Sequence, residues 1–422
     1  MKFTRPRGTN DFFGERLEVW RFVELALADY LRRCGYREMR TPIFESTELF
    51  VRAVGEATDI VSKEMYTFAD KKGRSLTLRP ENTAPVMRAF LENGLNRTGG
   101  VARFYYIGPM FRYDRPQAGR FRQFHQIGAE ALGSAGPAVD AEIIDASLGL
   151  YRVLGMPPLE VRLNSVGCPV CRPKFKEILT VSLGGLKEEL CAACLERTLT
   201  NPLRIFDCKE CGAVKEKLPR ITDHLCAECR EHFDALQRIL SEMGIRYVLD
   251  PLLVRGLDYY TKTAYEILHP SLGAQNALCG GGRYDGLAED CGGPATGAVG
   301  FSAGLERLME VLPAEFVAAR RTREADVSVA VLDEGSVARS LILARDLRSR
   351  GLAVVVDLSG RAFKKQLKAA SDARAAFTVI VGLSELEAGK AALKNMATGE
   401  QRPVRDEDLA AEIEKGLRTT NE

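Results

Sequence analysis

The segment MFRYDRPQAGRFRQFHQIGAE, residues 110–130, holds the pattern that decides the fold of this chain. Apolar runs stand on both sides of a basic, glycine-containing loop, and two strand-like runs joined in this way predict an antiparallel hairpin. Arg112 has apolar neighbours, so its strand is expected to face a core or a cleft. Arg115, Arg120 and Arg122 follow in the loop, and guanidinium groups match phosphate oxygens, which predicts a phosphate-rich ligand.

Outward from the hairpin, the apolar periodicity predicts more sheet, flanking helices and a separate second domain. Residues 16–36 carry apolar side chains at helical spacing, and TGAVGFSAGLERLMEVL, residues 296–312, is typical of a strand that passes through glycines into a helix. From Ala325 on, the Val-rich runs VSVAVL, LAVVVDL and FTVIVGL alternate with helical segments, as in a parallel sheet. The predicted fold class is therefore α+β, with an antiparallel sheet core and a C-terminal α/β domain.

Composition favours an ordinary globular enzyme. The chain has 422 residues, 45% hydrophobic and 27% charged, with a net charge of +2. A protein that coats nucleic acid non-specifically is usually strongly basic, so any nucleic-acid contact here must come from local patches. The charged start MKFTRPRGTN lacks the apolar core of a signal peptide, and no apolar run approaches the ~20 residues that span a bilayer. We therefore expect a cytoplasmic enzyme with no membrane partner.

Eight of the 11 cysteines form four CxxC pairs, with helical sequence between them: Cys168/Cys171, Cys191/Cys194, Cys208/Cys211 and Cys226/Cys229. Two such pairs can build a tetrahedral Cys₄ zinc site, so structural zinc is favoured over packed or exposed free thiols. Four pairs allow three groupings into two sites. The preferred grouping joins neighbours in sequence, the first pair with the second and the third pair with the fourth.

Taken together, the motifs resemble those of class II aminoacyl-tRNA synthetases, and in particular the histidyl-tRNA synthetase family. FRYDRPQAGRFRQFHQ is similar to the second class motif, which implies Arg112 on the ATP α-phosphate and Phe124 stacked on the adenine. It also implies Gln126 and Glu130 at the substrate histidine. The family usually has Glu where this chain has Asp114, so this shorter acid would reach the adenine amino group less directly.

Two further strings resemble the histidine-specific motifs of that family. VRGLDYYTKTAYE, residues 254–266, would by itself suggest a strand with an aromatic face, and the glycines of LCGGGRYDGL, residues 278–287, would suggest a turn. The resemblance implies Arg255 as a catalytic cation at the α-phosphate, next to the histidine like Arg112. The residues implied to line the amino-acid pocket are Tyr259, Tyr260 and Tyr284, the last at the imidazole.

Three other strings complete the resemblance. TLRPENTAPVMRAF, residues 77–90, implies Glu81 and Thr83 at the histidine amino group and imidazole. GAVGFSAGLERL resembles the third class motif and implies Arg307 on the γ-phosphate. GYREMRTPIFE, residues 35–45, resembles the first class motif, which implies a homodimer.

The resemblance covers nearly the whole chain and implies a histidine–tRNA ligase. Such an enzyme activates L-histidine with ATP and Mg²⁺ to histidyl-adenylate, and then transfers the histidyl group to the 3′ end of tRNA(His). AMP and pyrophosphate are released. The implied domains are a catalytic core in two parts, a Cys-rich helical insertion, a linker and an anticodon-binding domain: residues 1–165 and 246–317, 166–245, 318–326 and 327–422.

Three alternatives leave part of the sequence unexplained. A non-catalytic paralogue, the regulatory subunit of a phosphoribosyltransferase, is expected to lack the intact RGLDYY string and the C-terminal domain. A zinc-ribbon nucleic-acid-binding protein would account for the cysteines but not for the arginine motifs. A synthetase for another amino acid would share the three class motifs but not the two histidine-specific strings.

Overall fold

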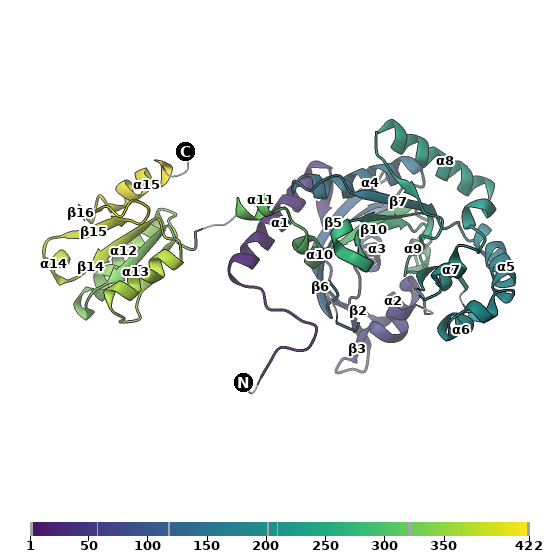
Figure 1. The fold of residues 1–422 in the computed structure, drawn as a ribbon, viewed down its shortest axis with the longest axis horizontal. Helices are drawn as coiled ribbons and strands as arrows, with labels where there is room; N and C mark the ends of the chain where they lie inside the picture. Colours follow the sequence, from purple (N-terminus) through teal and green to yellow (C-terminus); the bar gives the residue numbers. More distant parts are fainter. Residues whose placement is uncertain are drawn as a thin grey trace. The chain divides into compact units, whose positions relative to one another are not determined.

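The computed structural model describes residues 3–56, 58–116, 119–200, 202–208, 210–319 and 323–419. The chain divides into two compact units, Met1–Arg320 and Arg321–Glu422, and each is described by itself (Figure 1). Residues 320–322 of the expected linker lie outside the described residues. No helix in the described part of the chain is long and apolar enough to cross a membrane.

The predicted hairpin is confirmed and forms part of the central sheet of the first unit. Strand β5 (Ala102–Phe111) pairs antiparallel with β6 (Gln123–Leu132) along its full length, from Ala102 opposite Leu132 to Phe111 opposite Gln123. Eight described strands form the sheet in the order β1-β5-β6-β11-β10-β9-β7-β8, and the pairs from β5 to β7 are all antiparallel. The remaining strands are β1 (Arg37–Glu38), β7 (Glu160–Ser165), β8 (Val248–Leu249), β9 (Thr261–Leu268), β10 (Ala277–Arg283) and β11 (Ala298–Gly304).

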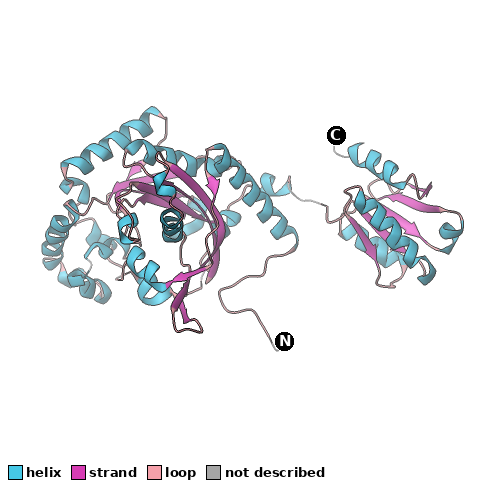
Figure 2. Ribbon diagram, turned by 180° about the vertical axis from the view of Figure 1, so that it is seen from behind, coloured by secondary structure: helices cyan, strands magenta, loops and turns pink. Residues whose placement is uncertain are grey.

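The two faces of this sheet differ because side chains alternate along a strand. In β6, Ile127, Ala129 and Ala131 join one hydrophobic core, while Phe124 and Leu132 pack with the other. The first core also contains residues of α1 (Gly14–Arg33), α4 (Pro137–Arg152) and α8 (Ala227–Glu242). The second contains residues of α2 (Thr47–Val54), α3 (Thr83–Glu92) and α9 (Leu287–Asp290). We call the face toward α2 and α3 the site face; Figure 2 shows the helices around the sheet.

Helix α1 confirms the amphipathic pattern read at residues 16–36, although it ends at Arg33. Its buried residues Val19, Val23, Leu27 and Leu31 recur every four positions, which gives one stripe toward the core. Three short strands form a second sheet in the order β2-β4-β3: Phe44–Ser46, Ser75–Leu78 and Tyr66–Ala69.

The Cys-rich insertion is helical, as predicted, and has a core of its own. Its helices are α5 (Cys171–Gly184), α6 (Ala192–Thr200) and α7 (Gly212–Lys215), with the 3₁₀ turns η3 (Lys187–Glu189), η4 (Pro202–Asp207) and η5 (Ile221–His224). Phe175, Leu179, Leu183 and Phe206 belong to this core. The chain then returns to the sheet through residues 250–260, which form turns and loop; the strand expected over the first histidine-specific string begins only at Thr261.

The second unit is an α/β domain, and its Val-rich runs are parallel strands as expected. β12 (Val327–Val331) pairs parallel with both β13 (Val354–Asp357) and β14 (Phe377–Val381). Two antiparallel strands, β15 (Lys390–Asn395) and β16 (Gln401–Arg405), extend the sheet beyond β14. The helices of this unit are α12 (Val337–Ser349), α13 (Phe363–Asp372), α14 (Leu383–Glu387) and α15 (Leu409–Thr419).

Candidate active site

A cavity, called here the active-site cavity, opens at the site face of the sheet. Ten of the twelve non-cysteine residues predicted for the site line it, and they come from all but one of the motifs that name a site residue: Glu81, Thr83, Arg112, Asp114, Phe124, Gln126, Arg255, Tyr259, Tyr260 and Arg307. Glu130 and Tyr284 are buried just beneath its wall, hydrogen-bonded to each other, and Glu130 also to Thr83. The structure therefore brings together residues that are far apart in sequence, including the two arginines of the proposed chemistry.

Arg112 stands at the end of β5, where the alternation of that strand directs it to the site face. Its Nε donates a hydrogen bond to the carbonyl oxygen of Pro80 at 2.8 Å, and its Cζ lies 5.3 Å from the ring centroid of Phe124. Burial lowers the pKa of this guanidinium, but an arginine remains protonated under ordinary conditions. Arg112 therefore presents a fixed positive charge beside an aromatic ring.

Arg255 enters the same cavity from the loop before β9. It forms an ion pair with Glu266, and its Cζ lies 5.6 Å from the Tyr260 ring centroid. Burial opposes its charge, but the Glu266 carboxylate and neighbouring groups raise the pKa of Arg255 above its ordinary value. Its buried Nε has no hydrogen-bond partner among the described residues, so a donor is left for a ligand.

The glycine run of the second histidine-specific string is strand rather than turn, and it makes room for Arg255. A Cβ atom on Gly280 would overlap the Arg255 guanidinium, and a Cβ on Gly281 would overlap the backbone of Gly300 and the ring of Tyr265. Glycine in a strand interior is normally unfavourable and marks a close approach. These positions are therefore glycine because a side chain would not fit at the cavity wall.

A buried acid and three hydroxyl groups form the floor of the site. Glu130 Oε1 accepts hydrogen bonds from Thr83 Oγ1 at 2.8 Å and from the Tyr106 hydroxyl at 3.4 Å, while Tyr284 donates to Glu130 Oε2. Burial raises the pKa of Glu130 to about 8, although these donors act in the opposite direction. Glu130 is therefore mainly protonated near neutral pH when no cation is present. The rings of Tyr259, Tyr260 and Tyr284 cluster above it, with centroids 4.7 to 6.5 Å apart.

Glu81 has a structural task that the sequence did not reveal. Its carboxylate accepts hydrogen bonds from the backbone N–H groups of Thr83 at 2.7 Å and Ala84 at 3.0 Å, so it satisfies the first turn of α3. Burial raises the pKa of Glu81 above its ordinary value. Gln126 donates to Ser302 Oγ at 3.4 Å, whereas its buried Oε1 has no partner among the described residues.

The loop of the hairpin contributes unequally to the cavity. Asp114 pairs with Arg120 at 2.9 Å, and both line the cavity, whereas Arg122 lies 3.8 Å from the Tyr113 ring centroid. Arg115 is not among the lining residues, and Gln117 and Ala118 fall outside the described part of the chain. Arg307, on α10 (Leu305–Glu310), donates to the carbonyl oxygens of Gly119 at 3.2 Å and Ala277 at 2.8 Å.

Sequence reasoning missed several residues that line the cavity. Glu266 holds Arg255, Tyr106 holds Glu130, and Glu64 and Ser302 add further oxygens. The alternation of side chains along β5 could have found Tyr106, because it stands six residues before Arg112, which directly follows that strand. The pairing of Glu266 with Arg255 depends on the path of a loop, and no local signal predicts it.

The cysteines form two clusters, but the grouping preferred from sequence is wrong. One cluster contains Cys168, Cys171, Cys226 and Cys229, and the other contains Cys191, Cys194, Cys208 and Cys211, with all Sγ atoms of a cluster within 4.8 Å of one another. Helix α5 has 14 residues and so carries the chain roughly 20 Å from its first pair before the next pair occurs. The second pair therefore meets the third, and the first meets the fourth when the chain returns at α8.

Comparisons with known proteins agree with this site. The family model described as histidyl-tRNA synthetase matches residues 8–169 and 188–308, and the model described as anticodon binding domain matches residues 326–416. The histidine–tRNA ligase of Caldanaerobacter subterraneus subsp. tengcongensis is 46% identical over 98% of this chain and 99% of its own length. The ligase of Thermotoga maritima is 48% identical over 98% of each chain. The crystal structure of apo S. aureus histidyl-tRNA synthetase is similar with a TM-score of 0.78 and 36% identity, covering 97% of this chain and 99% of that one.

The antiparallel sheet, the arginine-lined cavity and the separate anticodon-binding domain define an ATP-dependent aminoacyl-tRNA synthetase. Within that class, the chain belongs to the histidyl-tRNA synthetase family. This result excludes the alternatives of a zinc-ribbon protein and of a synthetase for another amino acid as accounts of the whole chain.

Proposed function

We propose that the active-site cavity carries out both steps of histidine–tRNA ligation, the function that family membership gives this chain. In the first step, the histidine carboxylate attacks the α-phosphorus of ATP, a P–O bond forms, and the bond to pyrophosphate breaks. In the second step, a hydroxyl of the terminal ribose of tRNA(His) attacks the histidyl carbonyl carbon, and AMP leaves. The observation that carries this proposal is that Arg112, Arg255 and Thr83 line one cavity, with Glu130 buried beneath its wall and hydrogen-bonded to Thr83.

The two arginines are assigned to the reacting phosphate. Negative charge grows on the non-bridging oxygens during the displacement, and donors already in place there lower the barrier. Arg255 has a buried Nε that pairs with no described residue and can donate to such an oxygen, and Glu266 holds its guanidinium in position. Arg112 is held by Pro80. Both groups can therefore act without reorganising during the reaction.

The remaining ATP contacts are assigned by position in the cavity. Phe124, beside Arg112, offers its ring to the adenine, and Asp114 faces the adenine amino group. Arg307 is assigned to the γ-phosphate. Mg²⁺ would enter with ATP and neutralise part of the phosphate charge; Glu64, a cavity carboxylate close enough to Arg112 to interact with its charge, supplies the kind of oxygen ligand that Mg²⁺ takes.

Histidine recognition is assigned to the buried acid and the tyrosines. Glu130 can accept a hydrogen bond from an imidazole N–H when ionised, and Tyr284 already donates to the same carboxyl group. The rings of Tyr259 and Tyr260 close the pocket, while Glu81, Thr83 and the free Oε1 of Gln126 face the amino group. An apolar amino acid would leave these buried polar atoms unpaired, which is a strong basis for rejection.

Amino-acid-dependent exchange of labelled pyrophosphate into ATP tests this proposal. The assay is run with Mg²⁺ and a panel of amino acids, and histidine should support exchange at least a hundredfold faster than any other. Equal exchange with an unrelated amino acid would contradict the assigned specificity. No exchange with any amino acid in a folded, ATP-binding preparation would contradict the assigned chemistry.

A homodimer is proposed from exposed apolar side chains near the first class motif. Ile43, Phe44 and Phe68 are 45%, 50% and 45% exposed, and the two phenylalanines lie on β2 and β3, the strands on either side of β4, with ring centroids 6.4 Å apart. Apolar residues gathered in this way mark an interaction surface. Light scattering should give twice the mass of 46.5 kDa, and a monomer at micromolar concentration would contradict the proposal.

Structural zinc is proposed at both cysteine clusters. Four sulfurs around zinc at about 2.3 Å form a tetrahedron with edges of about 3.8 Å. The described Sγ–Sγ distances are 3.7 and 3.8 Å in the first cluster and 3.7 Å between Cys191 and Cys208 in the second. Metal analysis of protein purified without chelator should find two zinc ions per chain. Less than one zinc for several chains would contradict the proposal.

A further inference from the structure

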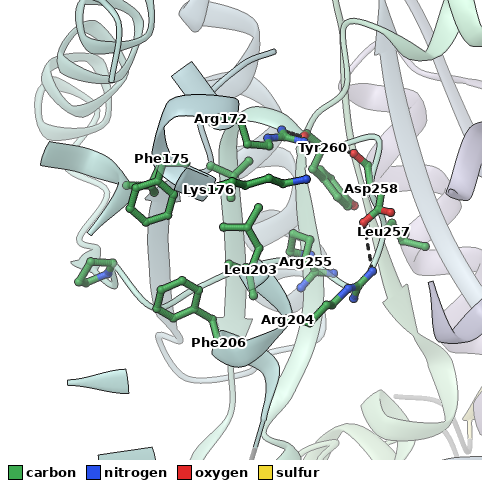
Figure 3. Close-up of a pocket in the computed structure, with 14 residues that line it drawn as sticks. Arg172, Phe175, Lys176, Leu203, Arg204, Phe206, Arg255, Leu257, Asp258 and Tyr260 are labelled. Atoms are coloured by element: carbon green, nitrogen blue, oxygen red, sulfur yellow. Dashed lines mark hydrogen bonds and ion pairs between the residues drawn. The ribbon is translucent and has the colours of Figure 1, made fainter. Parts of the chain in front are cut away.

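The segment from Arg255 to Lys262, which we call the pocket segment, carries Arg255, Tyr259 and Tyr260 into the active-site cavity but has loop conformation up to Tyr260. A second cavity, the rear cavity, lies behind it and is lined on its other side by the insertion (Figure 3). Arg255, Leu257 and Tyr260 of this segment line both cavities, as does Arg204 of the insertion. The pocket segment is therefore a wall with open space on each side, and apolar packing alone does not set its position.

A cationic side chain next to the first cysteine cluster, that of Arg172, contacts the pocket segment. Arg172 directly follows Cys171, and its guanidinium donates to the carbonyl oxygens of Tyr260, of Asp258 at 3.5 Å and of Gly167 at 3.4 Å. Figure 3 shows the side chain reaching across to the backbone at Tyr260. The pocket segment and the start of α5 are thereby joined through one planar group, whose fork of donors spans several acceptors.

The same cluster also reaches the end of the pocket segment from its other cysteine pair. Glu228 stands between Cys226 and Cys229 and pairs with Lys262 Nζ at 2.8 Å. Lys262 has a positive φ of 52°, which a non-glycine residue adopts only when its surroundings hold it there. Its backbone N–H donates to the Gly167 carbonyl oxygen at 2.8 Å. In each cysteine pair of this cluster, a residue directly next to a cysteine therefore contacts the pocket segment.

The second cluster contributes through η4. Arg204 lies on the chain between Cys194 and Cys208, and it donates to the Gly256 carbonyl oxygen at 3.2 Å and pairs with Asp258 at 3.1 Å. Lys215, four residues after Cys211, donates to the Phe206 carbonyl oxygen at 2.6 Å and so ties η4 to the end of that cluster. The position of Arg204 therefore depends on the cysteines on either side of it.

From these contacts we infer that the two cysteine clusters, when they bind metal, position the histidine pocket from behind through Arg172 and Arg204. Arg172 acts as a positioning residue, because it contacts the backbone of the pocket segment and is not among the residues that line the active-site cavity. Arg204 holds the backbone and Asp258 of the segment and also reaches the rim of that cavity. The inference rests on the zinc proposal and extends it: metal occupancy sets the affinity for histidine. ATP affinity is affected less, because only Arg255 of the residues assigned to ATP belongs to the pocket segment, whereas Arg112, Phe124 and Arg307 stand outside the pocket segment and the insertion.

The test uses the full-length enzyme and compares Arg172→Met, Arg172→Lys and Arg204→Met with the wild type. Lys174→Met is the matched control, because Lys174 is exposed on the same helix as Arg172. Zinc content, kcat and the KM values for histidine and for ATP are measured by metal analysis and pyrophosphate exchange. Arg172→Met should raise KM for histidine at least tenfold and lower kcat, with zinc content unchanged and KM for ATP within twofold. Arg172→Lys should recover part of the loss, because an ammonium group can still donate to Tyr260.

Metal dependence is tested with Cys226→Ser, alone and combined with Arg172→Met. The single variant should lose one zinc and show the KM shift for histidine, and the combined variant should show less than the product of the two effects, because both disturb one contact. An unchanged KM for histidine in Arg172→Met, or equal losses for histidine and ATP in both Arg172 variants, would overturn the positioning role. If Arg172→Met does not fold, Arg172→Lys and Arg204→Met decide the matter by the same criterion.

Failure of the zinc proposal gives a different result. Wild-type protein without zinc would overturn the metal part, even if Arg172→Met still raised KM for histidine. A Cys226→Ser protein that has lost zinc but binds histidine normally would overturn the link between metal and pocket, while leaving zinc as a structural ion.

Discussion

Replacing Glu130 with glutamine should change how the stability of the ligand-free enzyme depends on pH. Glu130 is 1% exposed and receives hydrogen bonds from Thr83, Tyr106 and Tyr284, and burial raises its pKa from 4.5 to about 8. In the unfolded chain the same group ionises near 4.5. Between these two pH values the folded protein therefore holds a proton that the unfolded protein releases.

The sign and size of the effect follow from this difference. The contribution of Glu130 to stability is fully present below about pH 4.5 and is lost as the pH rises through about 8. At about 1.4 kcal/mol for each pH unit, the interval corresponds to a loss of about 5 kcal/mol in the free energy of unfolding. Glutamine has nearly the same shape and no charge, so Glu130→Gln should remove this loss. A smaller decrease of stability with rising pH should remain in Glu130→Gln, because burial also raises the pKa of Glu81.

Urea unfolding followed by tryptophan fluorescence measures the stability of the first compact unit, which contains Glu130. The chain has one tryptophan, Trp20, which is 4% exposed in the core of the first unit, so the signal reports that unit alone. Measurements at pH 5, 6, 7 and 8, without histidine or ATP, should show stability falling in the wild type and nearly level in Glu130→Gln. Glu242→Gln, an exposed position on α8, is the control and should follow the wild type. Parallel pH profiles for the wild type and Glu130→Gln would refute the reasoning.

Three further substitutions test other parts of the site. Arg255→Ala should lower kcat for pyrophosphate exchange by 10²- to 10³-fold, about 3–4 kcal/mol, with the fold retained by circular dichroism; a loss below tenfold would contradict its role. Gly280→Ala should lower kcat at least tenfold because its Cβ would displace the Arg255 guanidinium, whereas Gly286→Ala, where a Cβ would meet no atom within 4 Å, should leave kcat unchanged; equal rates would argue against the space requirement. Phe44→Glu should halve the mass seen by light scattering, while Leu341→Glu, at an exposed leucine of the second unit, should not; a dimeric Phe44→Glu would place the interface elsewhere.

The parts of the fold that follow from local periodicity could be predicted from sequence. The hairpin of β5 and β6, the stripe of α1 and the parallel Val-rich strands each repeat their pattern over enough residues to exclude other structures. The strand expected before Thr261 was wrong for a physical reason. The carbonyl groups of Gly256, Asp258 and Tyr260 accept from arginine side chains of the insertion rather than from a strand ladder, and such long-range partners leave no local signal.

The candidate site was predicted less evenly. Motif resemblance located Arg112, Arg255 and Glu130, because those residues sit in strings long enough to recognise. It did not locate Glu266 or Tyr106, whose importance lies in which side chain they hold. The cysteine grouping failed in the same way, because joining neighbours in sequence ignores how far one helix carries the chain between them.

The positions where local rules fail gather around the pocket segment, and this is itself evidence about function. Gly280 weakens a central strand, Lys262 has an unfavourable φ, Glu130 is a buried carboxyl group, and Gln126 has a buried acceptor that no described residue pairs with. Each feature costs free energy in the ligand-free protein. A protein retains several such costs in one place only where another interaction offsets them. A cationic amino acid bound beside a phosphate would provide that interaction, because the amino acid would pair with Glu130 and Gln126 while the phosphate would pair with Arg255. If these four features were scattered over the surface, they would not indicate a binding site.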